Sequence, residues 1–149
     1  LKGGEPTGTV TVHSSRLRAT EVSGSEIPLL IDELPILAVA ATQAEGITEI
    51  RGAMELRFKE SDRIVAVTQG LAALGADIVE LEDGWRISGR SKLHGGRVSG
   101  MGDHRVAMAL AIAALTADSP VEIDDPECVG ISYPGFFGTL DALAGRDAS

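Results

Sequence analysis

The residues best suited to chemistry lie in one short charged stretch, Lys59-Glu60-Ser61-Asp62-Arg63. An apolar run at helical spacing follows it, which predicts that the stretch lies where a helix begins. The first turn of a helix has backbone N–H groups without internal partners and a partial positive charge. Lys59 and Arg63, four positions apart, share one helical face if Lys59 lies within that turn, so the stretch is suited to binding an anion. Glu60 between them would be an ionised carboxylate beside the bound anion, in a position for proton transfer.

The alternative for this stretch is an ordinary capped helix start with ion pairs at the surface, because such charge clusters are common. Two other predicted helix starts also carry polar groups, namely Asp32 near the first and Asp103-His104-Arg105 at the third. If the helices pack side by side, the three starts converge at one end of the fold. Two or three cationic side chains there would bind a polyanion such as a phosphorylated carboxylic acid. We expect Asp103 to act as a helix cap rather than as a catalyst.

Composition limits the partners that the chain can have. Its 149 residues are the length of one domain or of a piece of one, and its formal net charge of −9 disfavours a nucleic-acid surface. With Cys128 as the one cysteine and three scattered histidines, neither a disulfide within the chain nor a metal site is expected. The longest apolar run, Val106–Leu115, is too short to cross a membrane, and no signal peptide is evident, so we expect a cytoplasmic protein. The chain begins at Leu1 without an initiator Met, as expected for a fragment or for a trimmed chain.

Sequence patterns predict alternating strands and helices after the first few residues. The predicted strands are Thr9–His13, Thr48–Arg51, Asp77–Leu81, Trp85–Ser88, Arg97–Ser99 and Val121–Asp124. The predicted helices run from Glu33 or Leu34 to Ala44, from Lys59 to about Leu74, from His104 to about Leu115, and from Pro134 to about Ala144. Asp83-Gly84 is typical of a hairpin turn, and Gly75 is typical of a helix end.

The order of elements repeats, which favours duplicated units that bury one another. Helix, strand and helix from Asp32 to Leu74 recur from Asp103 to Ala144, and Asp103 follows Asp32 by 71 positions. The run Val106–Leu115 is apolar on all faces, as in a helix buried on every side. The strands alternate polar and apolar residues, as in sheets with one face in water. These patterns predict an α/β fold with helices inside and sheets outside.

Four motifs together resemble one known family. They are Ile31-Asp32-Glu33-Leu34-Pro35, Lys59-Glu60-Ser61-Asp62-Arg63, Gly102-Asp103-His104-Arg105-Val106-Ala107-Met108, and Asp125-Pro126-Glu127-Cys128 with Ser132-Tyr133-Pro134. In order and spacing they resemble the 3-phosphoshikimate 1-carboxyvinyltransferase (EPSP synthase) family over nearly the whole chain. The resemblance implies repeated βαβαββ units in an inside-out α/β barrel, with buried helices and outer mixed sheets. It also implies that residues 1–149 are the C-terminal part of one enolpyruvyl transferase domain, about two repeat units, without the N-terminal domain of the same enzyme.

The implied reaction transfers the enolpyruvyl group of phosphoenolpyruvate to the 5-hydroxyl of shikimate 3-phosphate and releases phosphate. This is a step of the shikimate pathway of aromatic amino acid biosynthesis, and the resemblance implies no metal or organic cofactor. By similarity, Asp32 is the base for the attacking hydroxyl, and Glu60 donates and recovers the proton at C3 of phosphoenolpyruvate. Arg63 and Arg105 clamp phosphoenolpyruvate, because planar guanidinium groups suit carboxylate and phosphate. The implied substrate-binding residues are Asp32, Lys59, Arg63, His104 and Arg105.

Two departures from the family pattern and two alternatives stand beside this interpretation. Where the family can have an asparagine that contacts shikimate 3-phosphate, this chain has Glu55. The family often has a lysine at the position of Ile131, so one phosphoenolpyruvate contact is missing here. A UDP-N-acetylglucosamine enolpyruvyl transferase would share the fold and the chemistry, although the Lys-Glu-Ser-Asp-Arg motif favours the shikimate enzyme. A non-catalytic repeat domain used for binding is the second alternative. Because part of the site lies in the absent domain, we expect no turnover by these 149 residues alone.

Overall fold

Two β-α-β units follow one another in this structure, a computed structural model that describes residue 4 and residues 7–145. The strands are β1 (Glu21–Val22), β2 (Ile47–Ile50), β3 (Asp77–Leu81), β4 (Gly84–Ser88), β5 (Gly96–Ser99) and β6 (Val121–Asp124). The helices are α1 (Ile27–Leu30), α2 (Leu34–Gln43), α3 (Arg63–Ala73), α4 (His104–Ala114) and α5 (Phe136–Leu143). Three 3-10 helices complete the fold: η1 (Gly24–Glu26), η2 (Met54–Phe58) and η3 (Pro126–Ile131).

Each unit places one apolar helix between two parallel strands. In the first unit α2 connects β1 to β2, and in the second α4 connects β5 to β6. The first unit continues through α3 into the β3–β4 hairpin, whose strand β4 pairs antiparallel with β2. The result is a four-stranded mixed sheet in the order β1-β2-β4-β3 and a two-stranded sheet of β5 and β6. The predicted repeat and the predicted hairpin are therefore both present.

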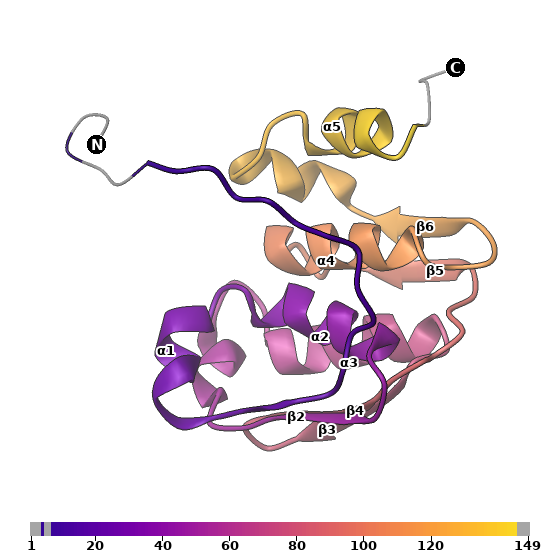
Figure 1. The fold of residues 1–149 in the computed structure, drawn as a ribbon. Helices are drawn as coiled ribbons and strands as arrows, with labels where there is room; N and C mark the ends of the chain where they lie inside the picture. The colour runs from indigo at the N-terminus through magenta and orange to yellow at the C-terminus, as the bar shows by residue number, and fades with distance from the viewer. Residues whose placement is uncertain (1–3, 5–6, 146–149) are drawn as a thin grey trace.

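The helices lie inside and the sheets lie outside, as the apolar helix pattern predicts. Figure 1 shows α2 and α3 between the four-stranded sheet and α4. Trp85 of β4 reaches into this layer without exposure to solvent, and its indole Nε1–H donates to the carbonyl oxygen of Ile64 at 3.0 Å. On β2 the side chains of Thr48 and Ile50 are buried and that of Glu49 faces outward, so one face of the sheet is covered and the other is wet.

One predicted strand is wrong, and the predicted helix starts need small corrections. Residues 7–17 lack regular secondary structure, and Val10 and Val12 are exposed, because no described strand pairs with this segment. The first strand is β1, which lies outside all of the predicted strands. The helix expected from Lys59 begins at Arg63, since Asp62 caps it, and the last helix begins at Phe136. Loops that lead into a helix often carry residues with helical composition, so pattern alone places such boundaries poorly.

The expectation that α4 is buried on every side is also wrong in part. Val106, Ala107 and Leu110 are buried against the neighbouring helices and η3, but Met108 and Ile112 keep part of their surface exposed. These two side chains border a cavity of about 180 Å³ between α2 and α4. Phe136 of α5 lines part of the same cavity, so this side of the helix is only partly covered by the described residues.

Candidate active site

Three helix starts converge at one end of the fold, as expected from the polar groups in the sequence. Asp32 lies in the turn before α2, Asp62 caps α3, and Asp103 caps α4. The Asp62 carboxylate accepts the backbone N–H of Val65 at 3.1 Å. The Asp103 carboxylate accepts the backbone N–H groups of Arg105 and Val106 at 2.9 and 3.3 Å. Capping therefore fixes the starts of α3 and α4, and with them the positions of the side chains nearby.

Arg63 is the centre of the cluster that these turns form. Its side chain is 1% exposed, and each of its three guanidinium nitrogens donates to a different carboxylate. Nε donates to Asp103 at 2.8 Å, one terminal nitrogen to Asp32 at 3.0 Å, and the other to Glu60 at 2.6 Å. The two predicted catalytic carboxylates, Asp32 and Glu60, are thereby held within the span of one guanidinium group.

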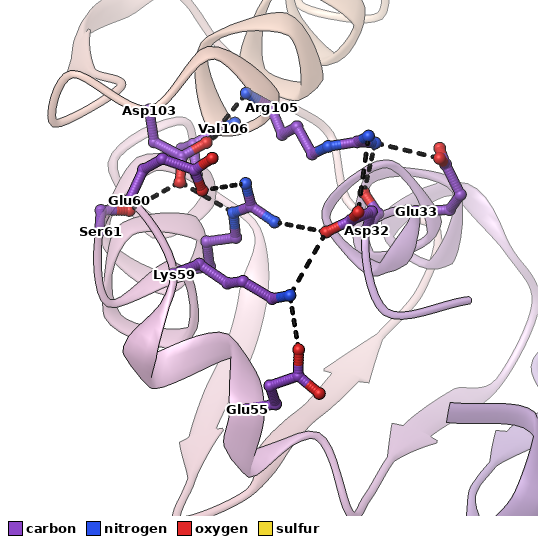
Figure 2. Close-up of polar contacts among 10 residues, drawn as sticks. Asp32, Glu33, Glu55, Lys59, Glu60, Ser61, Asp103, Arg105 and Val106 are labelled. Atoms are coloured by element: carbon purple, nitrogen blue, oxygen red, sulfur yellow. Dashed lines mark hydrogen bonds and ion pairs between the residues drawn. The ribbon is translucent and has the colours of Figure 1, made fainter. Parts of the chain in front are cut away.

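Two further cations approach Asp32 from other sides (Figure 2). Arg105 of α4 donates to the backbone carbonyl of Asp32 at 2.9 Å and to the Glu33 carboxylate at 3.0 Å, and it lies 3.7 Å from the Asp32 carboxylate. Lys59, at the end of η2, lies 2.5 Å from the carboxylate of Glu55 and 3.8 Å from that of Asp32. Asp32 is thus an ion-pair partner of Lys59, Arg63 and Arg105 together.

The surrounding charges set the ionisation of the two aspartates. Burial disfavours the ionised form of Asp32, but the hydrogen bond from Arg63 and the charges of Arg105 and Lys59 outweigh burial and lower its pKa. Asp103 is fully buried, which also disfavours ionisation, yet the hydrogen bond and charge of Arg63 lower its pKa as well. Burial alone would lower the pKa of Arg63, whereas Asp103 and the other carboxylates raise it. All three groups are therefore charged near neutral pH.

Carboxylates outnumber cations in this cluster. Its carboxylates are Asp32, Glu33, Glu55, Glu60 and Asp103, and its cations are Lys59, Arg63 and Arg105. An anion that binds here must therefore displace carboxylates from the cations. Glu33 and Glu55 are exposed at the rim, so Arg105 and Lys59 can exchange these partners for a ligand at the least cost.

His104 and the nearest cavity lie at the edge of this charged cluster. His104 is the first residue of α4, and its side chain makes no hydrogen bond with the described residues. Asp32 and Arg105 form the polar rim of the 180 Å³ cavity, but its walls are mainly apolar side chains such as Ile36, Met108 and Phe136. An apolar cavity does not suit a phosphate group, so the open surface at the helix starts is the better candidate for anion binding.

Sequence reasoning did not predict several members of the cluster. Asp103 is the cap that was predicted, but its buried ion pair with Arg63, 40 positions away, was not. Ser61 donates its hydroxyl to Asp103 at 3.2 Å, and Glu33 and Glu55 are partners of Arg105 and Lys59. The spacing of Glu55 and Lys59, four positions apart, was the one local signal available for these contacts.

The inside-out arrangement of repeated β-α-β units and the charged cluster at the helix starts define a protein of the enolpyruvyl transferase type. The structure resembles that of the enolpyruvyl transferase NikO from Streptomyces tendae with a TM-score of 0.69, over 88% of this chain and 29% of that chain. Sequence identity to NikO is 22%, so this likeness concerns the fold.

The family model described as EPSP synthase (3-phosphoshikimate 1-carboxyvinyltransferase) matches residues 3–140, and the chain belongs to this family. The chain is also similar to the solved EPSP synthase from Acinetobacter baumannii, with a TM-score of 0.81 and 39% identity over 87% of this chain and 30% of that chain. The resemblance seen in the sequence motifs is thereby confirmed, together with the fold that it implied.

Curated relatives carry the name 3-phosphoshikimate 1-carboxyvinyltransferase. The chain is 56% identical to the one from Petrotoga mobilis over 89% of its own length and 31% of that protein. It is 52% identical to the one from Syntrophomonas wolfei over 94% of its own length and 33% of that protein. The chain therefore spans about a third of the length of these relatives. None of the helices in its described part combines the length and apolar character that a membrane crossing requires.

Proposed function

We propose that this chain is the C-terminal part of a 3-phosphoshikimate 1-carboxyvinyltransferase, and that it carries half of the active site. The whole enzyme transfers the enolpyruvyl group of phosphoenolpyruvate to the 5-hydroxyl of shikimate 3-phosphate and releases phosphate. The names of the curated relatives support this acceptor over a UDP-sugar. The observation that carries the proposal is the buried Arg63, which holds Asp32 and Glu60 side by side at the converging helix starts.

The two carboxylates take the two proton transfers that the reaction requires. Asp32 removes the proton of the 5-hydroxyl as its oxygen attacks C2 of phosphoenolpyruvate, and Glu60 gives a proton to C3. In the elimination step Glu60 takes that proton back, the C2–O bond to phosphate breaks, and phosphate leaves. The proton held by Asp32 goes to the departing phosphate or to solvent. Arg63 contributes a fixed distance between the base and the acid, because it holds both in one plane.

Substrate binding prepares Asp32 for its role. An anion that takes Arg105 and Lys59 away from Asp32 removes charges that lower the pKa of Asp32, which makes this carboxylate a stronger base. Arg105 suits the carboxylate or phosphate of phosphoenolpyruvate, and Lys59 and Asp32 suit shikimate 3-phosphate. His104 has a position in this site only if it turns toward a bound substrate.

The remaining half of the site would come from the N-terminal domain of the same enzyme. An excess of carboxylates over cations within this chain supports that division, because binding two anionic substrates requires more positive charge than the cluster has free. Like the reaction, a cytoplasmic location is part of this proposal.

The test is phosphate release by the full-length enzyme with both substrates, measured for Glu60→Gln. Losing the acid should lower kcat by about 100-fold or more, as for removal of a general acid. Glu45→Gln is a matched control, because Glu45 is also an exposed carboxylate paired with an arginine, Arg90 at 2.8 Å, but lies beyond the other end of α2. An unchanged kcat in Glu60→Gln would favour a non-catalytic binding domain.

A further inference from the structure

Arg105 is held less firmly than Arg63, the other arginine of the cluster. Arg63 is 1% exposed, and each of its three guanidinium nitrogens already bonds to a carboxylate. Arg105 is 31% exposed and donates from one terminal nitrogen, to the carbonyl of Asp32 and to the carboxylate of Glu33. Its other terminal nitrogen lies 3.7 Å from the Asp32 carboxylate, which is too far for a hydrogen bond. Arg105 is therefore the arginine that an incoming anion reaches more easily.

The two acceptors of Arg105 differ in how easily they can be replaced. The Asp32 carbonyl belongs to the backbone of the turn before α2, so the 2.9 Å hydrogen bond ties the end of Arg105 to the fold. The Glu33 carboxylate, at 3.0 Å, ends a flexible side chain that is 62% exposed. An exposed ion pair contributes little to stability, because it competes with water and salt. An anion can thus replace Glu33 while the Asp32 carbonyl keeps Arg105 in place.

Glu33 stands at the capping position of α2 but does not cap this helix. Its side chain accepts no backbone N–H of the helix start, whereas Asp62 and Asp103 cap α3 and α4 in that way. The backbone carbonyl of Glu33 accepts the N–H of Leu37 at 3.0 Å, and this bond does not depend on the type of side chain. Figure 2 shows the Glu33 carboxylate directed at Arg105 instead. The fold therefore does not require the negative charge of Glu33 for its helix start.

This negative charge opposes the binding of any anion at Arg105. A carboxylate or phosphate on the guanidinium group would lie within a few ångströms of the Glu33 carboxylate, and like charges at that distance repel each other. The anion must either bind against this repulsion or displace Glu33 from Arg105. Both cases lower its affinity. When the anion leaves, the ion pair between Glu33 and Arg105 forms again, which favours release.

The proposed reaction gives this opposition a use. Each turnover releases phosphate, an anion that suits a guanidinium group. Phosphoenolpyruvate has a carboxylate as well as a phosphate, so it can contact a second cation of the site together with Arg105. Inorganic phosphate has one anionic group and depends more on each contact that it makes. A penalty at Arg105 therefore helps phosphate to leave, while the substrate remains bound through its second group.

We propose that Glu33 is a built-in competitor for Arg105, which weakens the binding of inorganic phosphate and promotes its release as product. The inference rests on the proposed function, because it takes phosphate to be a product that meets Arg105. Glu33 acts through Arg105 and not on the reacting atoms. Its removal should therefore tighten phosphate binding. If Glu33 only orients Arg105 for binding, its removal should weaken phosphate binding, so the two roles predict changes of opposite sign.

The test is a calorimetric titration of the full-length enzyme with inorganic phosphate. Glu33→Gln keeps the size of the side chain and removes its charge, and it should lower the Kd for phosphate by about fivefold, the scale of an exposed ion pair. Glu33→Asp keeps the charge and should change the Kd less. Glu45→Gln controls for net charge, since it removes an exposed carboxylate that pairs with Arg90 at 2.8 Å, and it should leave the Kd unchanged. An unchanged or higher Kd in Glu33→Gln would overturn the proposal, as would an equal fall in Glu33→Asp or Glu45→Gln.

A double variant shows whether Glu33 acts through Arg105. In an Arg105→Gln background, Glu33→Gln should bind phosphate no more tightly than Arg105→Gln alone, because the competition has been removed. A fivefold gain in that background would overturn the proposal. Turnover of the two substrates is measured on the same preparations. An active enzyme in which Glu33→Gln does not tighten phosphate binding contradicts the role of Glu33 alone. A protein that lacks turnover but shows the tightening contradicts the proposed reaction alone.

Discussion

Arg63 and Asp103 form an ion pair that is shielded from solvent on both sides. Their side chains are 1% and 0% exposed, and Arg63 Nε lies 2.8 Å from Asp103 Oδ2. The pair joins the start of α3 to the start of α4, and it leaves the two terminal nitrogens of Arg63 for Asp32 and Glu60. A buried charge that loses its partner is strongly destabilising, so this pair determines whether the site keeps its geometry.

Replacing Asp103 by Asn tests this role. Asn caps a helix about as well as Asp, so α4 keeps its cap, but Arg63 loses its buried counter-charge. We expect the free energy of unfolding to fall by about 3 kcal/mol, as for broken buried ion pairs. Urea unfolding of the full-length enzyme measures the loss. Asp62→Asn is the matched control, because Asp62 caps α3 and pairs with the more exposed Arg57 at 2.8 Å. Equal losses in both variants would contradict a special role for the buried pair.

Stability should depend on pH through the same pair. Arg63 lowers the pKa of Asp103 below that of the unfolded chain, about 3.9, despite burial of the carboxyl. A lowered pKa stabilises the fold above the unfolded-state value, and this contribution is lost as the pH falls through the folded-state value. We therefore expect the contribution to be complete above about pH 5 and to decline below about pH 4. Urea unfolding from about pH 5 to below about pH 4 should show a shallower acid decline for Asp103→Asn than for the unmodified protein. An identical decline would indicate that Asp103 does not titrate in this way.

Replacing Arg63 by Lys separates catalysis from stability. A lysine ammonium is a compact charge and cannot donate along the three fixed directions that reach Asp32, Glu60 and Asp103. We expect kcat of the full-length enzyme to fall by about 100-fold, because the acid and the base lose their common support. Steady-state phosphate release at saturating substrates is the measurement.

Arg57→Lys is the control for this change. Arg57 is also rich in hydrogen bonds, to Asp62, Glu80 and two carbonyls of the β3–β4 hairpin, but it contacts neither Asp32 nor Glu60. Both variants should lose stability, whereas kcat should fall in Arg63→Lys alone. A comparable loss of kcat in Arg57→Lys would show that the rate follows general stability rather than the site.

Local patterns in the sequence predicted most elements, because each depends on residues near one another. Asp83-Gly84 predicted the hairpin, Asp103 predicted the cap of α4, and the apolar runs predicted buried helices. The strand predicted at Thr9–His13 failed, since alternation alone does not supply a partner strand. Β-pairing is a long-range property, and β1 is so short that its pairing with β2, rather than its composition, defines it.

The sequence predicted the central residues of the candidate site, but not its outer carboxylates or its charge balance. The motifs predicted that Asp32, Glu60 and Arg105 lie together at one end of the fold, and in the structure these residues lie around Arg63. The sequence pointed to free cations, whereas Glu33 and Glu55 neutralise Arg105 and Lys59. The pairing of a long cationic side chain with one carboxylate or another depends on where the two residues lie in the fold. Spacing along the chain therefore did not predict these ion pairs.

The close approach of α3 and α4, which brings their capped starts together, depends on Gly70. A Cβ added at this position would lie 2.6 Å from one methyl carbon of the buried Leu110 and 2.9 Å from the other. Gly70→Ala gains about 1 kcal/mol in helix propensity, but overpacking costs about 1–3 kcal/mol, so the variant should be less stable by about 1 kcal/mol. Urea unfolding of the full-length enzyme provides the measurement. Gly138→Ala on α5 is the matched control, because its Cβ would meet no atom within 4 Å, and it should gain stability. An equal gain in stability in both variants would show that a methyl group fits between α3 and α4, and that Gly70 does not set the distance between these two helices.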